Sequence, residues 1–284
     1  MKRAIEKVLK GRPTIEGAGV RLKRAFGFDE APELDPFLML DDFHSGNPDD
    51  YLAGFPWHPH RGIETVTYML EGRVEHGDSM GNKGMLGPGD VQWMTAGSGI
   101  IHQEMPKGEN GNMWGFQLWV NLPASHKMMD PRYREVKNEE IREVEIGEET
   151  SVRVISGELR GVRGPVRDLV VDVEYLDVTM GQGSEFEHAI RKGNRTLAYV
   201  VRGSGYFDSE KKSPIIPEHL VIFTDGDSVR IRAQDEGLRF LLLSGKPLGE
   251  PVAWYGPIVM NTEEELEVAF REYRNGTFIK HKVR

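Results

Sequence analysis

The feature that most restricts the fold of this chain is its series of short apolar runs, each bounded by turn residues. The 284 residues include 33 Gly and 16 Pro. Between these residues lie apolar or alternating stretches that are typical of β-strands, at 64–72, 115–122, 169–180, 195–203 and 239–245. Many short strands separated by turns indicate a β-sandwich or a β-barrel. The sequence therefore predicts an all-β fold.

One stretch instead has the pattern of a helix, from Thr262 to about Arg274. Thr262 and Glu265 have the spacing of a capping box, in which each side chain bonds to a backbone N–H at the other position. The helix is expected to stop at the Asn-Gly pair 275–276. Between these signals, apolar residues recur at helical spacing, at Leu266, Ala269, Phe270 and Tyr273. We therefore expect a short C-terminal helix.

The two halves of the chain share a weak internal repeat. YMLEGRV at 68–74 is followed by PGDV at 88–91, and YVVRGSG at 199–205 is followed by DGDSV at 225–229. Each copy has the pattern of two strands and a Gly-Asp turn that leads into another strand. The polar stretch 125–144 is typical of a surface connector. The repeat therefore predicts two similar β-barrels.

Composition and charge exclude several classes of protein. Asp and Glu total 45 against 36 Lys and Arg, a net charge of −9 that opposes binding to nucleic-acid phosphates. The absence of Cys excludes disulfides, thiolate metal ligands and thiol catalysis. The first twenty residues lack the apolar segment of a secretory signal, and no apolar run reaches the ~18 residues of a membrane span. We therefore expect a cytoplasmic protein that binds neither nucleic acid nor membrane.

Two short histidine motifs have the pattern of a metal site. His58 and His60 precede a strand-like run, and His102 and Glu104 follow a Gly-rich turn. Side chains two residues apart lie on the same face of a strand, so both pairs can point inward. Imidazole and carboxylate groups suit a divalent transition metal. Four such ligands leave one or two coordination positions open, as a catalytic metal requires.

The residues alone leave two alternatives open. A His-x-His pair in a soluble protein is more often a surface or hydrogen-bonded pair than a ligand set. In addition, Glu64 has the same strand parity as His58 and His60. Spacing therefore does not choose between Glu64 and Glu104 as the carboxylate ligand.

Long blocks of the sequence resemble the pirin family of the cupin superfamily. They are FLMLDDFHSG (37–46), HPHRGIETVTYMLEG (58–72), PGDVQWMTAGSGIIHQEMP (88–106) and GFQLWVNLP (115–123). The resemblance extends over the whole chain and is strongest at residues 35–125. It implies a bicupin, with two antiparallel β-barrels face to face. Residues 1–130 would form an N-terminal barrel with the metal site, and residues 131–284 a metal-free barrel that ends in the helix.

The resemblance also implies a ligand set and a cofactor. Pirin-like proteins bind one metal per chain, usually iron, through three His and one Glu, which fall here on His58, His60, His102 and Glu104. Glu64 would then orient a ligand or accept hydrogen bonds while buried. Fe(II) is the expected ion, and the same ligands also accept Mn, Co, Ni, Cu or Zn.

The internal repeat allows a test of the second half. The repeat offsets place no neutral metal ligand at the positions that correspond to the four ligands, which are Ala189, Arg191, Arg239 and Leu241. His188 lies one residue out of register, and such a shift turns a side chain to the opposite face of a strand. The second half is therefore expected to be a metal-free copy.

The function that the resemblance implies is that of a metal-dependent dioxygenase. Its substrates would be O2 and a flavonol such as quercetin, whose ring it would open, with Glu104 as general base. The main alternative is an iron-dependent regulatory protein, of the transcription co-regulator type, that acts through a protein partner. A third interpretation is a sugar or polyketide-like isomerase that uses the metal without oxygen.

Several residues near the ligand motifs have two interpretations. Four tryptophans are candidates to line an aromatic pocket, although Trp in a β-barrel usually belongs to the core: Trp57, Trp93, Trp114 and Trp119. Trp57 and Trp93 are the better candidates because they neighbour the ligand strands. Arg61 either steers an anionic substrate or pairs with an acid. His44 either reaches the pocket or caps a turn.

Overall fold

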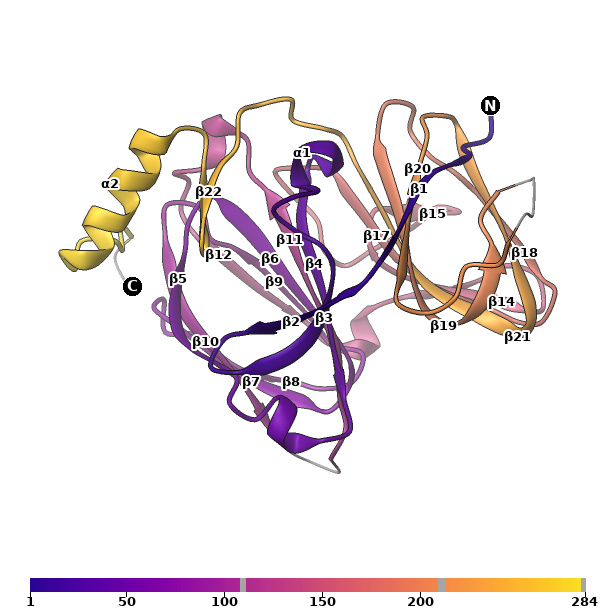
Figure 1. Cartoon of the computed structure of the whole chain (residues 1–284), viewed down its shortest axis with the longest axis horizontal. Coiled ribbons are helices and arrows are strands. Elements are labelled where there is room, and N and C mark those ends of the chain that lie inside the picture. Colours follow the sequence, from indigo (N-terminus) through magenta and orange to yellow (C-terminus); the bar gives the residue numbers. More distant parts are fainter. Residues whose placement is uncertain (108–110, 209–212, 282–284) are drawn as a thin grey trace. The chain divides into compact units, whose positions relative to one another are not determined.

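The computed structural model describes residues 1–107, 111–208 and 213–281, which form two compact units (Figure 1). Residues 13–138 and 248–284 belong to one unit, named here the histidine unit, and residues 1–12 and 139–247 belong to the second unit. Strands dominate both, and the described residues contain two α-helices, α1 (Ala31–Leu34) and α2 (Glu263–Arg274). Neither helix combines the length and the apolar character that a membrane crossing requires. The all-β class and the short C-terminal helix are confirmed.

Apart from a C-terminal hairpin, the described strands of the histidine unit form two antiparallel sheets rather than one closed ladder. The larger sheet has the order β12-β9-β6-β11-β4-β3-β2, and the smaller has the order β5-β10-β7-β8. The larger sheet contains β2 (Arg12–Glu16), β3 (Val20–Phe26), β4 (Phe37–Ser45), β6 (Ile63–Glu71), β9 (Val91–Thr95), β11 (Met113–Asn121) and β12 (Arg132–Val136). The smaller sheet contains β5 (Phe55–His60), β7 (Arg73–Asp78), β8 (Lys83–Leu86) and β10 (Ile100–Lys107).

The predicted alternation of side chains is clearest in β10. Ile100, His102 and Glu104 are buried, whereas Ile101 and Gln103 between them are partly exposed. An extended strand turns successive side chains to opposite faces, so His102 and Glu104 share the inner face.

The second unit is built around one sheet with the order β1-β20-β19-β21-β17-β14-β13, and β18 pairs with β21. These strands are β1 (Ile5–Lys10), β13 (Glu143–Glu145), β14 (Thr150–Ser156), β17 (Val173–Met180), β18 (Glu185–Ala189), β19 (Arg195–Tyr206), β20 (His219–Phe223) and β21 (Ser228–Gly245). A short hairpin, β15 (Glu158–Leu159) and β16 (Val162–Arg163), completes the unit. Its core consists mainly of Val, Leu, Ile and Phe side chains that are buried, together with Met180, Ala198 and Ala233.

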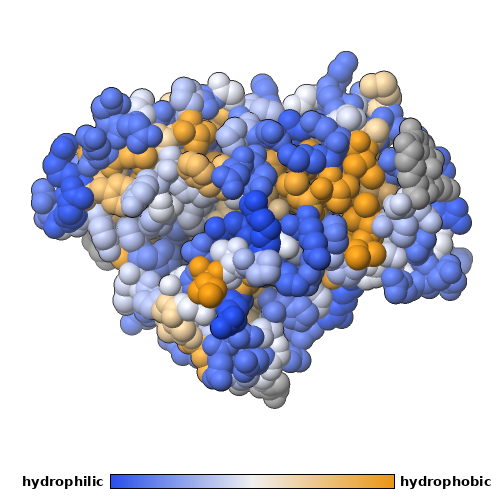
Figure 2. Space-filling model, in the orientation of Figure 1, coloured by the Kyte–Doolittle hydropathy of each residue, from blue (hydrophilic) through white to orange (hydrophobic). Residues whose placement is uncertain are grey.

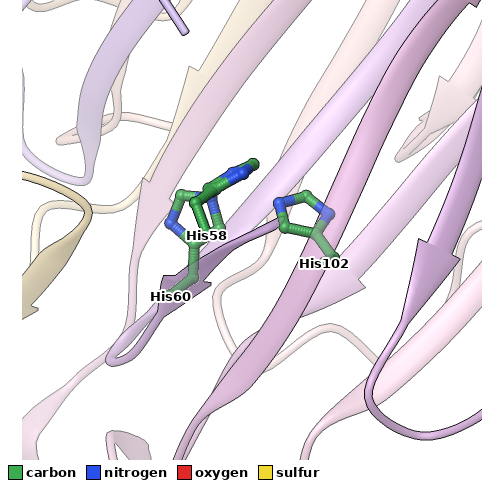
Figure 3. Close-up of side chains that lie close together, drawn as sticks. All are labelled: His58, His60 and His102. Atoms are coloured by element: carbon green, nitrogen blue, oxygen red, sulfur yellow. The ribbon is translucent and has the colours of Figure 1, made fainter. Parts of the chain in front are cut away.

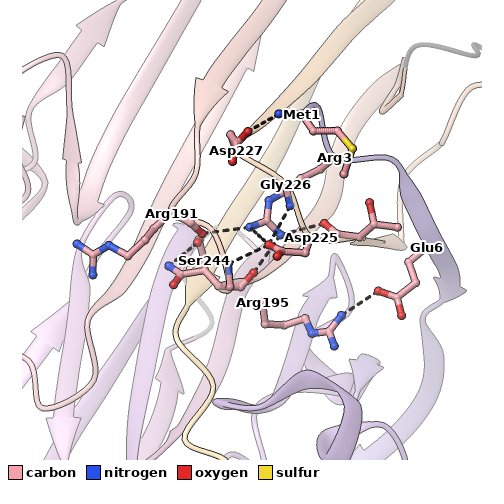
Figure 4. A network of polar contacts seen from close by, with 12 residues as sticks. Met1, Arg3, Glu6, Arg191, Arg195, Asp225, Gly226, Asp227 and Ser244 are labelled. Carbon is pink, nitrogen blue, oxygen red and sulfur yellow. Dashed lines mark hydrogen bonds and ion pairs between the residues drawn. The ribbon is translucent and has the colours of Figure 1, made fainter.

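The N-terminal segment belongs to the second unit because its polar contacts lie there (Figure 4). Strand β1 pairs antiparallel with β20. The buried guanidinium of Arg3 donates to the carbonyl oxygens of Asn194, Thr224 and Arg191. Arg195 also forms an ion pair with Glu6 at 2.9 Å.

The C-terminal segment belongs to the histidine unit instead. Its hairpin of β22 (Ala253–Tyr255) and β23 (Ile258–Met260) leads into α2, and the buried Lys127 ammonium donates to the Val259 carbonyl at 3.1 Å. The capping box is present, since Glu265 N donates to Thr262 Oγ1 and Thr262 N donates to Glu265 Oε2. Hydrophilic residues dominate the visible surface of α2 (Figure 2).

The units therefore differ from the expected division at residue 130. The break between residues 138 and 139 lies close to the expected boundary. However, residues 1–12 group with residues 139–247, and residues 248–284 group with residues 13–138. The expectation assumed that each barrel is continuous in sequence. Long-range pairing of β1 with β20, and packing of 248–284 on the histidine unit, break that assumption.

Candidate metal centre

Strands β5 and β10 bring three imidazole rings together. The two strands pair antiparallel, with His102 opposite His58 and Ile100 opposite His60. The ring centroids lie 4.3 Å apart for His58 and His102 and 5.0 Å apart for His60 and His102. One nitrogen from each of the three rings lies within 4.8 Å of the other two (Figure 3). This cluster could hold a metal ion.

Hydrogen bonds fix which nitrogens of two rings are free. His58 Nδ1 lies 2.9 Å from the Pro56 carbonyl oxygen, and His60 Nδ1 lies 3.0 Å from the Pro257 carbonyl oxygen. A carbonyl oxygen only accepts, so each Nδ1 carries the hydrogen and donates it. Both Nε2 atoms are then unprotonated in the neutral rings, and they lie only 3.0 Å apart. Two lone pairs at this distance repel each other unless a cation lies between or beside them.

The third ring lacks hydrogen-bond partners. His102 is fully buried, and neither of its ring nitrogens has a partner among the described residues. Burial, followed by the nearby His58, lowers the pKa of His102 and of His60 well below the usual value. The rings of His60 and His102 are therefore neutral. Neutral imidazoles with unshared nitrogens are the form that binds transition metals.

Glu104 lies beside the imidazole cluster but is held by another group. Its Oε1 lies 2.8 Å from the Thr67 hydroxyl, which also lies 2.7 Å from Gln117 Oε1. The hydroxyl has one hydrogen and donates it to one of these oxygens at a time. The carboxylate of Glu104 is not part of the group of atoms that lie within 4.8 Å of one another.

Glu64 has a different environment. It is fully buried, and its carboxylate accepts hydrogen bonds from Thr95 Oγ1 at 2.6 Å and from Trp93 Nε1 at 3.1 Å. Burial raises its pKa against the opposing effect of these two donors. It does not line the cavity described next, whereas Glu104 does. Its contacts match the interpretation of a buried hydrogen-bond acceptor.

A cavity of about 700 Å³ within the histidine unit opens onto these groups. His58, His60 and Glu104 line it, together with many apolar side chains. Seven of the lining residues are Phe, Tyr or Trp: Phe28, Phe43, Tyr51, Phe55, Trp119, Trp254 and Tyr255. Ligand pockets commonly combine such an apolar lining with a few polar groups that fix orientation.

Comparison with known proteins identifies the family. A family model for pirin matches residues 19–120, and a model for the pirin C-terminal cupin domain matches residues 175–279. The chain belongs to the pirin family. A pirin-like protein of Caulobacter vibrioides is 46% identical over 277 residues, which cover 97% of this chain and 99% of that protein. Pirin of Homo sapiens is 43% identical over 269 residues, which cover 93% and 90%. A crystal structure of quercetin 2,3-dioxygenase from Acinetobacter baumannii superposes with a TM-score of 0.90 at 30% identity and full coverage of both chains.

The two tryptophans favoured as pocket residues do not line the cavity of this pirin-family chain. Trp57 is 53% exposed, and Trp93 is buried and bonded to Glu64, so neither lines the cavity. Trp119 and Trp254 line it instead. Trp119 was among the four candidates, and it lies two residues after the cavity-lining Gln117 on β11. Trp254 was not a candidate, because it lies far along the chain in the C-terminal hairpin.

Arg61 and His44 also lie outside the cavity. The buried Arg61 guanidinium lies 2.8 Å from the Glu272 carboxylate and donates to the Phe278 carbonyl at 2.9 Å. Of its two interpretations, pairing with an acid is the one observed. The exposed His44 stacks on Trp114, with ring centroids 4.0 Å apart.

One histidine beside the cluster was not predicted from the sequence. His76 on β7 is buried, and its ring centroid lies 5.5 Å from that of His102. It stacks on Tyr133, and its Nε2 lies 3.4 Å from Asp78 Oδ2. It lies on the second strand after the first ligand motif, opposite Glu104, and its position on a strand next to a ligand strand is the feature that could have identified it.

The corresponding positions of the second unit hold other groups. Arg239 forms two hydrogen bonds to the Asp177 carboxylate, at 3.0 and 2.7 Å, and Leu241 is fully buried. Arg191 forms an ion pair with Asp172, and His188 lies 2.9 Å from Glu174 Oε1.

Proposed function

We propose that the protein is a metal-dependent dioxygenase that opens the ring of a flavonol such as quercetin with O2. The observation that carries the proposal is the pair of facing Nε2 atoms of His58 and His60, 3.0 Å apart, beside the unpartnered ring of His102. A divalent cation removes the repulsion between these lone pairs and gives His102 a partner. The name of the structurally similar quercetin 2,3-dioxygenase suggests the substrate.

The residues proposed to hold the ion are His58, His60, His102 and Glu104. Three imidazoles and a carboxylate fit Fe(II), which we propose as the native ion, and they also fit Mn, Co, Ni, Cu and Zn. The backbone carbonyls of Pro56 and Pro257 support this role, since they fix the tautomers and orient two of the rings. When bound, a divalent ion would stabilise the anion of the flavonol 3-hydroxyl and so lower its pKa.

The side chains around this centre have roles of their own. Glu104 accepts the proton of the 3-hydroxyl as general base, and the Thr67 hydroxyl holds its carboxylate in place. The aromatic lining, which includes Trp119 and Phe55, contacts the flat rings and excludes water. In the overall reaction one O2 is consumed and one carbon monoxide is released for each flavonol that is opened.

Oxygen uptake by metal-loaded protein tests the proposal. The protein is purified anaerobically and loaded with Fe(II), and O2 consumption is followed after quercetin is added. We expect uptake that depends on both metal and quercetin and that falls by about 10²-fold or more in Glu104→Gln, the range for loss of a general base. The matched control is Glu75→Gln, a carboxylate on the neighbouring strand β7 that pairs with Lys107 at the surface.

Two results would contradict the proposal. If oxygen uptake in Glu104→Gln equalled that of the unsubstituted protein, Glu104 would not be the general base. Fully loaded protein without uptake on any flavonol would favour the regulatory alternative, in which the metal modulates a surface for a protein partner.

A further inference from the structure

A second polar group lies in the cavity that holds the histidines. It consists of Glu16, Arg24 and Asp41, all of which line the cavity. Arg24 donates to both carboxylate oxygens of Asp41 at 2.8 Å, and its Nη2 lies 2.9 Å from Glu16 Oε1. Asp41 is only 3% exposed. We call these three residues the acid–arginine group; the proposed reaction does not use them.

Strand register connects this group to the proposed base. Asp41 on β4 lies opposite Arg24 on β3 and opposite Gln117 on β11, and Gln117 lies opposite Thr67 on β6. These four positions thus form one row across four neighbouring strands, and Thr67 bonds to Glu104 at the end near the histidines. Neighbouring strands lie about 4.8 Å apart, so the two steps from Thr67 to Asp41 span on the order of 10 Å. The row therefore has the extent of a molecule of several linked rings.

The acid–arginine group has a net negative charge, and it can accept hydrogen bonds from a ligand. Two carboxylates and one guanidinium sum to −1, and each Asp41 oxygen keeps a lone pair after it accepts from Arg24. Burial raises the pKa of Asp41 to about 6 against the opposing effect of Arg24, so the carboxylate is ionised at neutral pH. Phenolic hydroxyls are neutral donors that suit such acceptors, whereas a ligand carboxylate would be repelled.

We propose that the acid–arginine group determines substrate specificity, an inference that rests on the proposed function. It accepts hydrogen bonds from phenolic hydroxyls on the part of the flavonol that lies away from the histidines. The cavity walls between the two polar ends are mainly apolar and aromatic, so they hold the flat rings and leave the hydroxyls to Asp41 and Glu16. A site built to bond a ligand hydroxyl discriminates strongly against an analogue without it, because its own polar group is left unpaired.

Two flavonols and three variants test this assignment. The ligands are quercetin and the parent flavonol whose sole hydroxyl is the one at position 3. Their dissociation constants are measured on anaerobic, metal-loaded protein, for the unsubstituted chain and for Asp41→Asn and Glu16→Gln. The matched control is Asp42→Asn, the next carboxylate on β4, which is buried, accepts from Trp114 Nε1 and does not line the cavity.

We expect the unsubstituted chain to bind quercetin more tightly than the simpler flavonol. This preference should fall roughly tenfold or more in Asp41→Asn, as for a lost hydrogen bond to a charged group, and should be unchanged in Asp42→Asn. Glu16→Gln should also reduce the preference, and because Glu16 is partly exposed this variant keeps the test valid where Asp41→Asn fails to fold.

The failure of this inference differs from the failure of the proposed function. The specificity role would be overturned if the preference for quercetin were the same in the unsubstituted chain, in Asp41→Asn and in Glu16→Gln. That result would leave the flavonol proposal intact. Binding of neither flavonol to metal-loaded protein would overturn both.

Discussion

Among single residues, His58 and His60 carry the argument for a metal, because their hydrogen-bonded Nδ1 atoms leave both Nε2 atoms facing each other. We predict that His58→Ala abolishes tight metal binding and leaves the fold intact. His44→Ala, at an exposed histidine outside the cavity, should retain one equivalent per chain. Elemental analysis after reconstitution measures the metal, and thermal unfolding followed by circular dichroism measures the fold. Loss of cooperative unfolding in His58→Ala would mean that the metal is structural.

Lys127 is a buried cation that binds the C-terminal segment to the rest of the histidine unit. Its ammonium donates to Gly62 O, Asn121 Oδ1 and Val259 O at 2.9, 2.7 and 3.1 Å. Lys127→Met would leave these three acceptors without their donor, and each buried unpaired group costs about 1–3 kcal/mol. We predict a loss of about 3 kcal/mol or more in the free energy of unfolding, measured with urea. A change below about 0.5 kcal/mol, as for a typical surface substitution, would contradict this account.

The same residue predicts a dependence of stability on pH. Burial lowers the pKa of Lys127 from 10.5 to about 8. Between these two pH values the unfolded chain binds more protons at this group than the folded chain does. The contribution of Lys127 to the free energy of unfolding therefore rises from pH 8 to pH 10.5, and it is lost as the pH falls back to about 8. The full effect corresponds to roughly 3 kcal/mol. The free energy of unfolding of the unsubstituted chain minus that of Lys127→Met should therefore increase from pH 8 to pH 10.5, and a constant difference would be inconsistent with a lowered pKa.

At the scale of elements, the C-terminal segment completes the candidate site. Its Pro257 carbonyl orients His60, and its Val259 carbonyl lies so close to Gly62 that an added Cβ would be 1.9 Å from the oxygen. Gly62→Ala should therefore displace the hairpin, lower the free energy of unfolding by several kcal/mol and weaken metal binding. Gly62 also has a positive φ of +79°, which strains any side chain.

Gly81→Ala separates the two effects. Gly81 has a φ of +91° but no atom within 4 Å of an added Cβ. It should therefore show only the backbone strain, about 1–2 kcal/mol, and retain metal affinity. Urea unfolding measures the stability of the two variants, and metal titration measures their affinity for the metal. If Gly62→Ala and Gly81→Ala lost equal amounts of both, the Val259 contact would have no part in the site.

Local patterns in the sequence predicted local structure well. Alternation along β10 placed His102 and Glu104 on one face, and the Thr262–Glu265 capping box predicted the start of α2. These features depend on residues a few positions apart, whose geometry the backbone fixes. Contacts between distant segments were beyond such reasoning. The assignment of the C-terminal helix to the histidine unit depends on Lys127 and Arg61, which meet partners far along the chain.

At the level of the whole molecule, the residues proposed to hold the metal all belong to one of the two compact units. An ion that binds only the folded state raises its stability, by about 4 kcal/mol at a free concentration of 1,000 times the dissociation constant. Scanning calorimetry should therefore show a higher unfolding temperature for the transition that contains the histidine unit when Fe(II) is added. The His102→Ala variant should show no such shift, and an equal shift in both proteins would mean that iron binds elsewhere.

The most direct test of the central claim is an anomalous difference map from crystals grown with Fe(II) and measured at the iron edge. We predict one peak per chain, bound by Nε2 of His58 and His60 together with a ring nitrogen of His102. A peak at another position, a second peak in the second unit, or no peak from protein that holds one equivalent of iron in solution would contradict this prediction.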